Sequence, residues 1–411
     1  MPAPFFLGGL PLRSPAMSAP TRLAALPPGP FARLATLLGE VKPGKAPISL
    51  AVGDPQGAVP DFVTTALAEA TSRFGGYPNI SGTEDWRDAA AGWLNTRFGL
   101  GGRITPERHV LPLAGTREGL FSVLFPFVPE TKAGGRPIVA MPNPFYQCYA
   151  AAALAAGAEP LYVPATRDNG FLPDFAALPE TALARLAAVY VCSPSNPEGA
   201  VADEAYWTAL FALADAHDFI VLADECYADI YFDRPPACAL PTRLRTRGGF
   251  QRLLTFHSLS KRSALPGLRS GMVAGCARLI EAFRTFRNVA GPTVSGPLLA
   301  ASAAAWRDEA HVAANRAAFA AKMAAAEKIL GDRMIRPQGG FFLWLDVGNG
   351  EEFALRAWAA QGVRLLPGAY LGREIEPGKT QSNPGFSYVR VALVNDLSTI
   401  MTALERLREI L

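Results

Sequence analysis

The sequence predicts an α/β fold in which a mainly parallel, doubly wound sheet forms a large domain and a smaller α+β domain completes the chain. Short apolar runs, bounded by Gly, Pro or Asn and without polar alternation, are typical of parallel strands that are covered on both faces. Helical patterns such as Glu204–His217 separate these runs, which indicates βαβ units. The predicted strands of the large domain are Ile138–Met141, Pro160–Val163, Ala187–Cys192, Ile220–Ala223, Arg252–Phe256 and Met272–Ala274.

The smaller domain is expected to draw on both ends of the chain. A short helix is predicted at Phe31–Leu38 and a strand at Ile48–Val52, ahead of the helical patterns that start near residue 61. Past Gly296 a long Ala-rich helix is predicted at Leu298–Leu330, followed by a strand (Gly340–Val347), a helix (Glu352–Ala360), a strand (Tyr388–Leu393) and a closing helix. We therefore expect residues 61–295 to form the large domain, and residues 1–60 with 296–411 to form the smaller one.

Composition and charge exclude several classes of protein. Half of the residues are hydrophobic and 18% are charged, so a sizeable core can be buried. The net charge of +3 is spread without a block of like charges, which argues against a nucleic-acid binder. No apolar run reaches the ~18 residues that a membrane helix needs. We expect no nucleic-acid partner and no membrane partner.

The N-terminus and the cysteines bear on the compartment. Residues Met1–Ala16 lack early positive charge and are broken by prolines, which makes them a poor secretory signal, and Met17 offers another start. The five cysteines have no CxxC spacing and no histidine at metal-ligand intervals, so no metal site is expected. Their mostly apolar neighbours indicate reduced thiols in a cytoplasmic protein.

Lys261 carries the strongest chemical signal. It lies in the run SLSKRSALPGLRSG, directly after a predicted strand. A surface turn with a basic residue explains this motif alone about as well as a functional site does. The functional alternative is a lysine in an enclosed site, where a lowered pKa makes the amine nucleophilic enough to form a Schiff base. Ser258, Ser260 and Arg269 would then hold a phosphate, the arginine through its two-pronged guanidinium.

Two further segments follow predicted strands and fit such a cofactor. Asp224 follows the predicted strand Ile220–Ala223. As an isolated feature, an Asp after a strand is more often a loop residue or a helix cap. Beside Lys261, its carboxylate would pair with a protonated pyridine nitrogen and make the ring an electron sink. Tyr227 and Asn196 would each donate to the phenolate oxygen of that ring, although Asn196-Pro197 alone indicates only a turn.

The remaining candidates are individually weak. Gly115, Thr116 and Arg117 open a helix running through Phe121–Leu124, where bare backbone N–H groups bind anions, although Gly-Thr before a helix is usually only a cap.

Three single residues complete the set. Tyr146, after the strand Ile138–Met141, is either a core aromatic or a side chain stacked on a flat ring. Arg390 interrupts an alternating strand, where it is either a charge at a sheet edge or a guanidinium that suits a substrate α-carboxylate. Tyr77 lies in a loop that would reach another subunit.

In this order and at these intervals, the residues resemble the class I and II aminotransferases of pyridoxal phosphate (PLP) fold type I, from Gly53 to Arg390. The resemblance implies a pyridoxal 5'-phosphate cofactor bonded to Lys261, and a homodimer with sites at the subunit interface. The implied cofactor contacts are Asp224 at the ring nitrogen, Tyr227 and Asn196 at the phenolic oxygen, Tyr146 on the ring, and Gly115, Thr116, Arg117, Ser258, Ser260 and Arg269 around the phosphate, with Tyr77 from the partner subunit. Gly53, Asn196 and Arg390 are the implied substrate-binding residues.

The resemblance also implies the chemistry. An amino donor displaces Lys261, and the freed amine becomes the base that moves a proton from the α-carbon. Lys261, Asp224 and Tyr227 are the expected catalytic residues. A keto acid leaves, and the same steps run backward on a second keto acid.

Several stretches resemble the bacterial N-succinyldiaminopimelate aminotransferases of lysine biosynthesis. They are Pro28–Leu34, Ala114–Glu118, Pro142–Gln147, Asp224–Tyr227, Ser258–Ser263 and Leu366–Leu371. This resemblance implies amino transfer between glutamate and N-succinyl-2-amino-6-oxopimelate. The chain departs from that group at Gln56, where a basic residue often stands, and Arg262 is our hypothesis for the cation that binds the distal carboxylate instead.

Two other functions are compatible with the same cofactor-binding residues. The chain would carry the same cofactor residues as an aspartate, aromatic or unsuccinylated diaminopimelate aminotransferase. It would also keep them as a non-catalytic PLP-binding regulator, but such proteins fuse this scaffold to a DNA-binding domain, and about 45 residues before the first strand leave little room for one.

Overall fold

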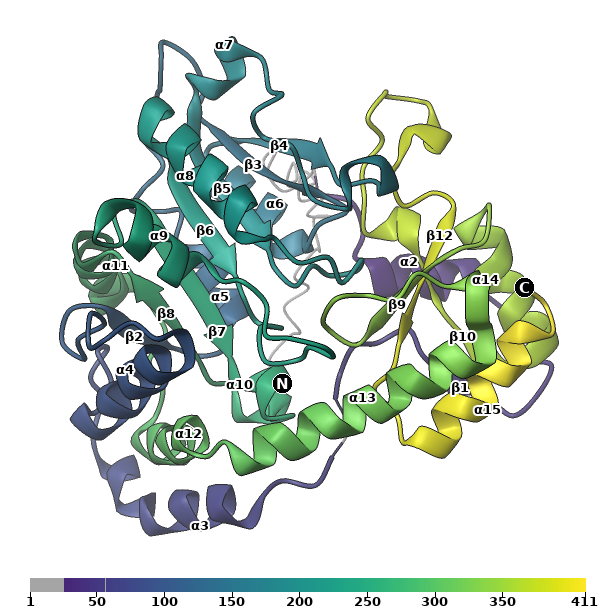
Figure 1. Cartoon of the computed structure of the whole chain (residues 1–411), viewed down its shortest axis with the longest axis horizontal. Coiled ribbons are helices and arrows are strands. Elements are labelled where there is room, and N and C mark those ends of the chain that lie inside the picture. The colour runs from purple at the N-terminus through teal and green to yellow at the C-terminus, as the bar shows by residue number, and fades with distance from the viewer. Residues whose placement is uncertain (1–25, 56) are drawn as a thin grey trace, which may run out of the picture.

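The computed structural model describes residues 26–55 and 57–411 (Figure 1). The alternative start at Met17 and the segment Met1–Ala16 lie outside these ranges, as does Gln56. Across the described ranges, no helix combines the length and the apolar character that a membrane crossing requires. The five cysteines are all free thiols.

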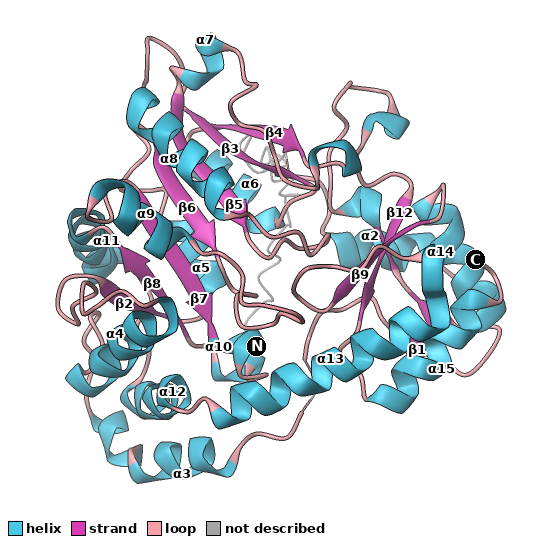
Figure 2. Cartoon of the chain, in the orientation of Figure 1, coloured by secondary structure: helices cyan, strands magenta, loops and turns pink. Residues whose placement is uncertain are grey.

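A seven-stranded sheet forms the centre of the larger body (Figure 2). Its order is β2-β8-β7-β6-β5-β3-β4, and β8 alone runs against the others, because it pairs antiparallel with both β7 and β2. The mainly parallel sheet that the sequence predicts is confirmed. Its strands are β2 (Val110–Leu113), β3 (Ile138–Asn143), β4 (Glu159–Pro164), β5 (Leu186–Cys192), β6 (Ile220–Asp224), β7 (Leu253–Ser258) and β8 (Gly271–Gly275).

Helices cover both faces of this sheet, which is why its strands are apolar throughout. Alternate residues of β5 enter different cores: Val189 packs into one hydrophobic cluster, and Tyr190 into the other. The first cluster takes in α4 (Glu84–Phe98), α8 (Glu204–His217), α9 (Ala239–Arg247) and α12 (Gly296–Arg307). The second takes in α5 (Thr116–Ser122), α6 (Gln147–Ala155) and α11 (Ala277–Ala290).

Helix α8 has the bounds that the sequence predicts, because its ends carry strong local signals. Asp203 caps the first turn by accepting a hydrogen bond from the Tyr206 backbone N–H at 2.7 Å. The helix ends at Asp218, whose φ of 55° is left-handed.

The smaller body is an α+β unit built around its own hydrophobic cluster. Its three-stranded antiparallel sheet has the order β11-β12-β9, and β1 from the N-terminal segment pairs in parallel with β10. The strands are β1 (Ile48–Ser49), β9 (Phe342–Asp346), β10 (Val363–Arg364), β11 (Leu366–Pro367) and β12 (Tyr388–Ala392), and the helices are α2 (Pro30–Leu38), α13 (Ala310–Leu330), α14 (Gly350–Gln361) and α15 (Leu397–Arg408).

The prediction of a single helix at Leu298–Leu330 is wrong. The chain forms two helices, α12 and α13, with a break at Asp308 and Glu309. Helix α12 packs on α3 (Asp61–Glu69) and α4, and its Trp306 is buried in a core of the large sheet. We therefore propose that the large domain extends through α12, so that the boundary falls near residue 308 rather than 295. The Ala-rich pattern runs through the break and gives no sign of it.

Candidate active site

A pocket of about 990 Å³ lies at the carboxyl ends of the parallel strands. Because parallel strands end at one edge of a sheet, the residues that follow β3, β5, β6 and β7 meet there. The predicted residues that line the pocket are Gly53, Thr116, Arg117, Tyr146, Asn196, Asp224, Tyr227, Ser258, Ser260, Lys261, Arg269 and Arg390. Of the residues predicted from sequence, Gly115, Tyr77 and Arg262 are not part of its wall.

Lys261 lies in α10 (Leu259–Arg262), the short helix that directly follows β7. The Ser258 hydroxyl accepts a hydrogen bond from the Ser260 backbone N–H at 3.1 Å and fixes the start of this turn. The Lys261 Nζ donates to the carbonyl oxygen of Gly53 at 2.6 Å. Burial lowers the pKa of Lys261 to about 8, against the opposing effect of Asp54. The neutral, nucleophilic form of this amine is therefore far easier to reach than in a solvated lysine.

Gly53 has to be a glycine because an aromatic ring lies against it. A Cβ at this position would lie 2.5 Å from the Cζ of Phe342. The close approach brings the Gly53 carbonyl into the pocket, where it accepts the hydrogen bond from Lys261.

Asp224 is the last residue of β6 and is only 5% exposed. Its Oδ2 accepts a hydrogen bond from the Tyr149 hydroxyl at 2.6 Å, and its Oδ1 accepts one from the Cys226 backbone N–H at 3.3 Å. Burial raises the pKa of Asp224, although its hydrogen bonds with Cys226 and Tyr149 act in the opposite direction. No cation within the described ranges forms an ion pair with it. A protonated pyridine nitrogen would supply the missing countercharge.

Tyr146 forms another part of the wall, at the start of α6. Its ring meets that of Tyr149 edge to face, with centroids 5.6 Å apart. Arg117 donates a hydrogen bond from Nε to the Tyr146 hydroxyl, so the structure places this guanidinium against the tyrosine. Burial raises the pKa of Tyr146 to about 12, which keeps its hydroxyl protonated.

The part of the pocket wall around Arg269 suits an anion. Gly115 has a φ of +86°, and a Cβ on it would lie 2.1 Å from Nη2 of Arg269, so the guanidinium occupies space that only a glycine leaves. The backbone of Arg269 is itself left-handed, with a φ of 53°. Its Nη1 donates to the Pro266 carbonyl at 2.9 Å, and the pocket wall beside it carries the hydroxyls of Ser258 and Ser260. A guanidinium with neighbouring hydroxyls suits a phosphate.

Arg390, on β12 of the smaller body, is a buried cation that faces the same pocket. It is 5% exposed, and it donates to Asn196 Oδ1 and to the Ala51 carbonyl, each at 2.9 Å. Its Nε has no hydrogen-bond partner, and no carboxylate of the described residues forms an ion pair with it. Burial lowers the pKa of Arg390 to about 10, so the group stays charged at neutral pH. An α-carboxylate would satisfy it.

Tyr227 also lines the pocket. Its ring packs edge to face on Phe341 and Phe342, with centroids 5.5 and 5.9 Å away. Burial raises the pKa of Tyr227 well above its usual value, so its hydroxyl remains a donor. Tyr77, by contrast, is fully exposed and lies outside the pocket, and its expected contact with a partner subunit stays a prediction.

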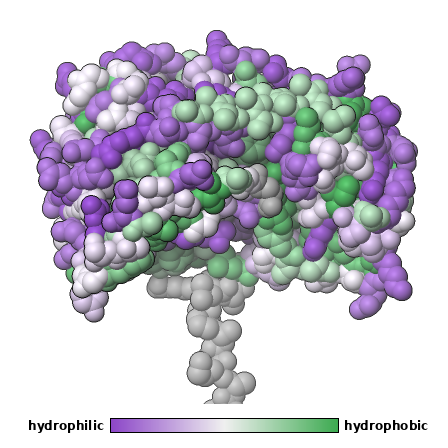
Figure 3. Space-filling model, turned by 90° about the horizontal axis from the view of Figure 1, so that it is seen from below, coloured by the Kyte–Doolittle hydropathy of each residue, from purple (hydrophilic) through white to green (hydrophobic). Residues whose placement is uncertain are grey.

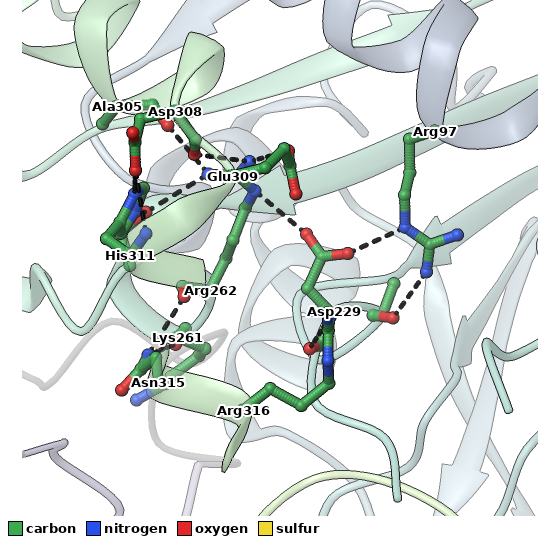
Figure 4. A network of polar contacts seen from close by, with 12 residues as sticks. Arg97, Asp229, Lys261, Arg262, Ala305, Asp308, Glu309, His311, Asn315 and Arg316 are labelled. Carbon is green, nitrogen blue, oxygen red and sulfur yellow. Dashed lines mark hydrogen bonds and ion pairs between the residues drawn. The ribbon is translucent and has the colours of Figure 1, made fainter. Parts of the chain in front are cut away.

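The hypothesis that Arg262 binds a distal carboxylate is wrong. Arg262 is 3% exposed, does not line the pocket, and lies within an ion-pair network behind Lys261 (Figure 4). Its Nε is 3.0 Å from Asp229 Oδ2, and its other nitrogens contact Glu309 and the Ala305 carbonyl. The rings of Trp93 and Trp306 each lie 5.2 Å from its guanidinium. Sequence alone does not show which side of α10 faces the core.

This network joins the lysine segment to the long helix α13. The Asn315 side chain donates to the Arg262 carbonyl at 3.0 Å and to the Lys261 carbonyl at 3.3 Å. The His311 Nε2 lies 2.8 Å from the Ser263 hydroxyl. The backbone that carries Lys261 is therefore anchored from behind by the helix that leads into the smaller body (Figure 4).

Replacing Arg262 with Met is expected to lower the stability of the protein by about 3–5 kcal/mol, because the buried carboxylate of Asp229 would lose the more deeply buried of its two cationic partners. The change is measured as a shift of the thermal or guanidinium chloride unfolding midpoint. Glu309→Gln is the matched control: it removes an exposed partner of the same arginine and should cost less than about 1 kcal/mol. Equal midpoints for the wild type and the Arg262 variant would show that the network does not stabilise the fold.

Two residues of the site were not predicted from sequence. Tyr149, which orients Asp224, lies one helical turn after Tyr146 on α6, and this i, i+3 spacing was an available signal. Arg373 lines the pocket from the loop after η5 (Gly368–Tyr370), a segment of the smaller body with no local motif that marks it.

The described side chains fit pyridoxal phosphate on three separate points. A buried lysine with a lowered pKa faces the pocket, a buried carboxyl lacks a cation, and an arginine with two serines forms a cradle beside Gly115. Lys261 would hold the aldehyde carbon, Asp224 the ring nitrogen, and Arg269 with Ser258 and Ser260 the phosphate.

Comparison with known proteins agrees with this arrangement. The family model described as aminotransferase class I and II matches residues 45–397. The chain is 32% identical, over 400 residues, to an LL-diaminopimelate aminotransferase of Desulforudis audaxviator, covering 94% of this chain and 96% of that one.

Solved structures are similar over almost the whole length. An aminotransferase from Neisseria meningitidis has a TM-score of 0.89 at 37% identity, covering 95% of this chain and 99% of that one. A probable N-succinyldiaminopimelate aminotransferase from Thermus thermophilus has a TM-score of 0.80 at 26% identity, covering 93% of this chain and all of the other.

Proposed function

Because the chain belongs to the class I and II aminotransferases, a PLP-dependent family, we propose that it transfers an amino group between glutamate and N-succinyl-2-amino-6-oxopimelate, in the biosynthesis of diaminopimelate and lysine. The observation that carries the proposal is one pocket in which a lysine of lowered pKa, a buried carboxyl and a buried arginine converge, the last two without an ion pair among the residues that the structure describes.

Each of these groups has a distinct part in the reaction. When bound, pyridoxal phosphate supplies an aldehyde that takes up the amino group and a ring that accepts the electron pair left on the α-carbon. Lys261 holds the cofactor between turnovers, and its Nζ, once released, takes the proton from the substrate α-carbon. Asp224 keeps the ring nitrogen protonated, and Tyr149 holds the Asp224 carboxylate in position. Arg390 fixes the substrate α-carboxylate and so aligns the α-carbon with Lys261.

The substrate side of the proposal rests on the segments that resemble the N-succinyl group of enzymes, and on the pocket wall beyond the charged residues. That wall includes Leu26, Pro27 and Phe31 from the N-terminal segment. Apolar walls of this kind suit the methylene chain of a succinyl group. The second candidate is diaminopimelate without succinylation, which the names of the relatives that are about 30% identical favour.

The experiment compares N-succinyl-LL-diaminopimelate with LL-diaminopimelate as amino donors to 2-oxoglutarate, with glutamate formation as the readout. Aspartate and phenylalanine are the control donors. We expect kcat/KM for the succinylated donor to exceed the others by tenfold or more, about 1.4 kcal/mol in transition-state terms. Equal values for the two diaminopimelate donors would refute the succinyl assignment, and a higher value for the free compound would establish the second candidate.

We also propose that the chain acts in the cytoplasm as a homodimer. Tyr77 is fully exposed, and the side chains of Phe74 and Val289 are also mostly exposed. The face seen from below, on the side of α3, carries hydrophobic patches among hydrophilic residues (Figure 3). Such patches support association between copies. Sedimentation equilibrium should give twice the 43.7 kDa mass of the chain.

A further inference from the structure

A cation without an acidic partner lies on the pocket wall at Arg373, within the part of the chain that the structure describes. We propose that Arg373 binds the distal carboxylate of the substrate's pimelate chain, at the other end of that chain from the reacting amino group. The inference rests on the proposed N-succinyldiaminopimelate substrate and names the residue that would bind the second carboxylate of its pimelate chain.

The backbone at this position is held rigidly by a residue of the large sheet. Asn143, the fully buried last residue of β3, accepts a hydrogen bond from the Arg373 backbone N–H at 2.9 Å and donates one to the Arg373 carbonyl at 2.9 Å. A Cβ on the preceding Gly372 would lie 2.3 Å from Asn383 Oδ1, so the tight passage needs a glycine. An arginine anchored through both backbone groups is preorganised for a ligand.

The side chain is fixed without being neutralised. Its guanidinium lies 4.9 Å from the ring centre of Phe145 and 5.8 Å from that of Tyr162, and its Nη1 donates to the Gly372 carbonyl at 2.8 Å. Burial lowers the pKa of Arg373, the charge and hydrogen bond of Tyr162 act in the opposite direction, and the charge of Arg33 adds to the lowering. Within residues 26–55 and 57–411 no carboxylate forms an ion pair with Arg373, whereas the neighbouring Arg33 has Glu351 at 3.7 Å.

The other cations of the pocket have roles in the proposed reaction. Lys261 and Arg269 would hold the cofactor, Arg117 contacts Tyr146, and Arg390 contacts Asn196 and the Ala51 carbonyl. Among the described residues, Arg373 and Arg390 have different hydrogen-bond partners, so each can take a separate carboxylate in one pocket. The Arg373 guanidinium lies over the ring of Phe145, and Phe145 directly precedes Tyr146 in the chain. The position of Arg373 is therefore fixed relative to Tyr146, the residue expected to stack on the cofactor ring.

The test uses two amino donors of equal length that differ only in the distal carboxylate: L-2-aminopimelate and L-2-aminoheptanoate. For the holoenzyme with Arg373→Met, kcat/KM for aminopimelate should fall about 10- to 100-fold, mainly through KM, as expected for a lost hydrogen-bonded charge pair. The value for aminoheptanoate should change less than about threefold. Arg373→Lys should recover part of the loss, because it restores the charge without the bidentate geometry.

The control is Arg33→Met, which removes the neighbouring positive charge that already has Glu351 opposite it. It should leave the preference for aminopimelate within about threefold of the wild-type preference. A parallel loss with both donors in Arg373→Met, an unchanged preference, or an equal loss of preference in Arg33→Met would each overturn the proposal. A failure of the proposed function is separable, because it would appear in the comparison of succinylated and free diaminopimelate with the wild-type protein, which does not involve a change at Arg373.

Discussion

Replacing Lys261 with Ala is expected to reduce transamination by at least about 10⁴-fold, while the protein still folds and still binds pyridoxal phosphate. The variant loses both the amine that is bonded to the cofactor and the base that takes the α-proton. The phosphate cradle at Arg269 and Gly115 and the carboxyl of Asp224 do not depend on the lysine side chain. The measurement is glutamate formation from the succinylated donor, with cofactor binding followed by equilibrium dialysis.

The matched control is Lys328→Ala, an exposed lysine on α13 that lies outside the pocket. Its activity should equal that of the wild type. If Lys261→Ala kept the wild-type rate with the cofactor bound, the proton transfer that we assign to Lys261 would have to come from another group.

Asp224→Asn should lower kcat by about 10²–10³-fold, the effect typical of losing one preorganised electrostatic group at the reacting centre. Asn has the same size as Asp and can still accept the hydrogen bond from the Tyr149 hydroxyl, but it carries no charge to hold a proton on the ring nitrogen. The rate constant of a single turnover with glutamate should fall by the same factor, because product release does not contribute to that measurement.

Glu225→Gln provides the control for burial. Glu225 is the next residue and is equally buried, its Oε1 accepts from the Ala239 backbone N–H at 2.7 Å, and it does not line the pocket. Burial raises the pKa of Glu225 to about 8, so the side chain is mainly neutral at pH 7 and the amide is a close mimic. Equal single-turnover rates for Asp224→Asn and Glu225→Gln would show that the charge of Asp224 is not needed at the ring nitrogen.

Most of the site was predictable because its residues directly follow strands. Asp224 and Lys261 come within three residues of strand ends, and a parallel sheet brings such positions to one edge whatever the rest of the fold does. The close approach of Arg269 to Gly115 was not visible in the sequence, since it depends on a left-handed arginine far along the chain.

The parts that sequence could not predict depend on tertiary packing. Arg262 directly follows Lys261, yet its side chain turns to Asp229, where Trp93 and Trp306 enclose it. Strand β2 was not predicted, because its four residues include Pro112, which pairing at a sheet edge tolerates. Arg373 reaches the pocket from the smaller body, and no periodic pattern in the sequence shows that this loop lies next to the strand ends of the large sheet.

Reduction of the cofactor-loaded protein with borohydride, followed by peptide mapping, tests the central claim most directly. We expect one phosphopyridoxyl label, on the peptide that contains Lys261, together with loss of the visible absorbance of the loaded protein. A label on any other lysine, such as Lys132 or Lys322, or no stable label at all, would contradict the assignment of Lys261 as the residue that holds the cofactor.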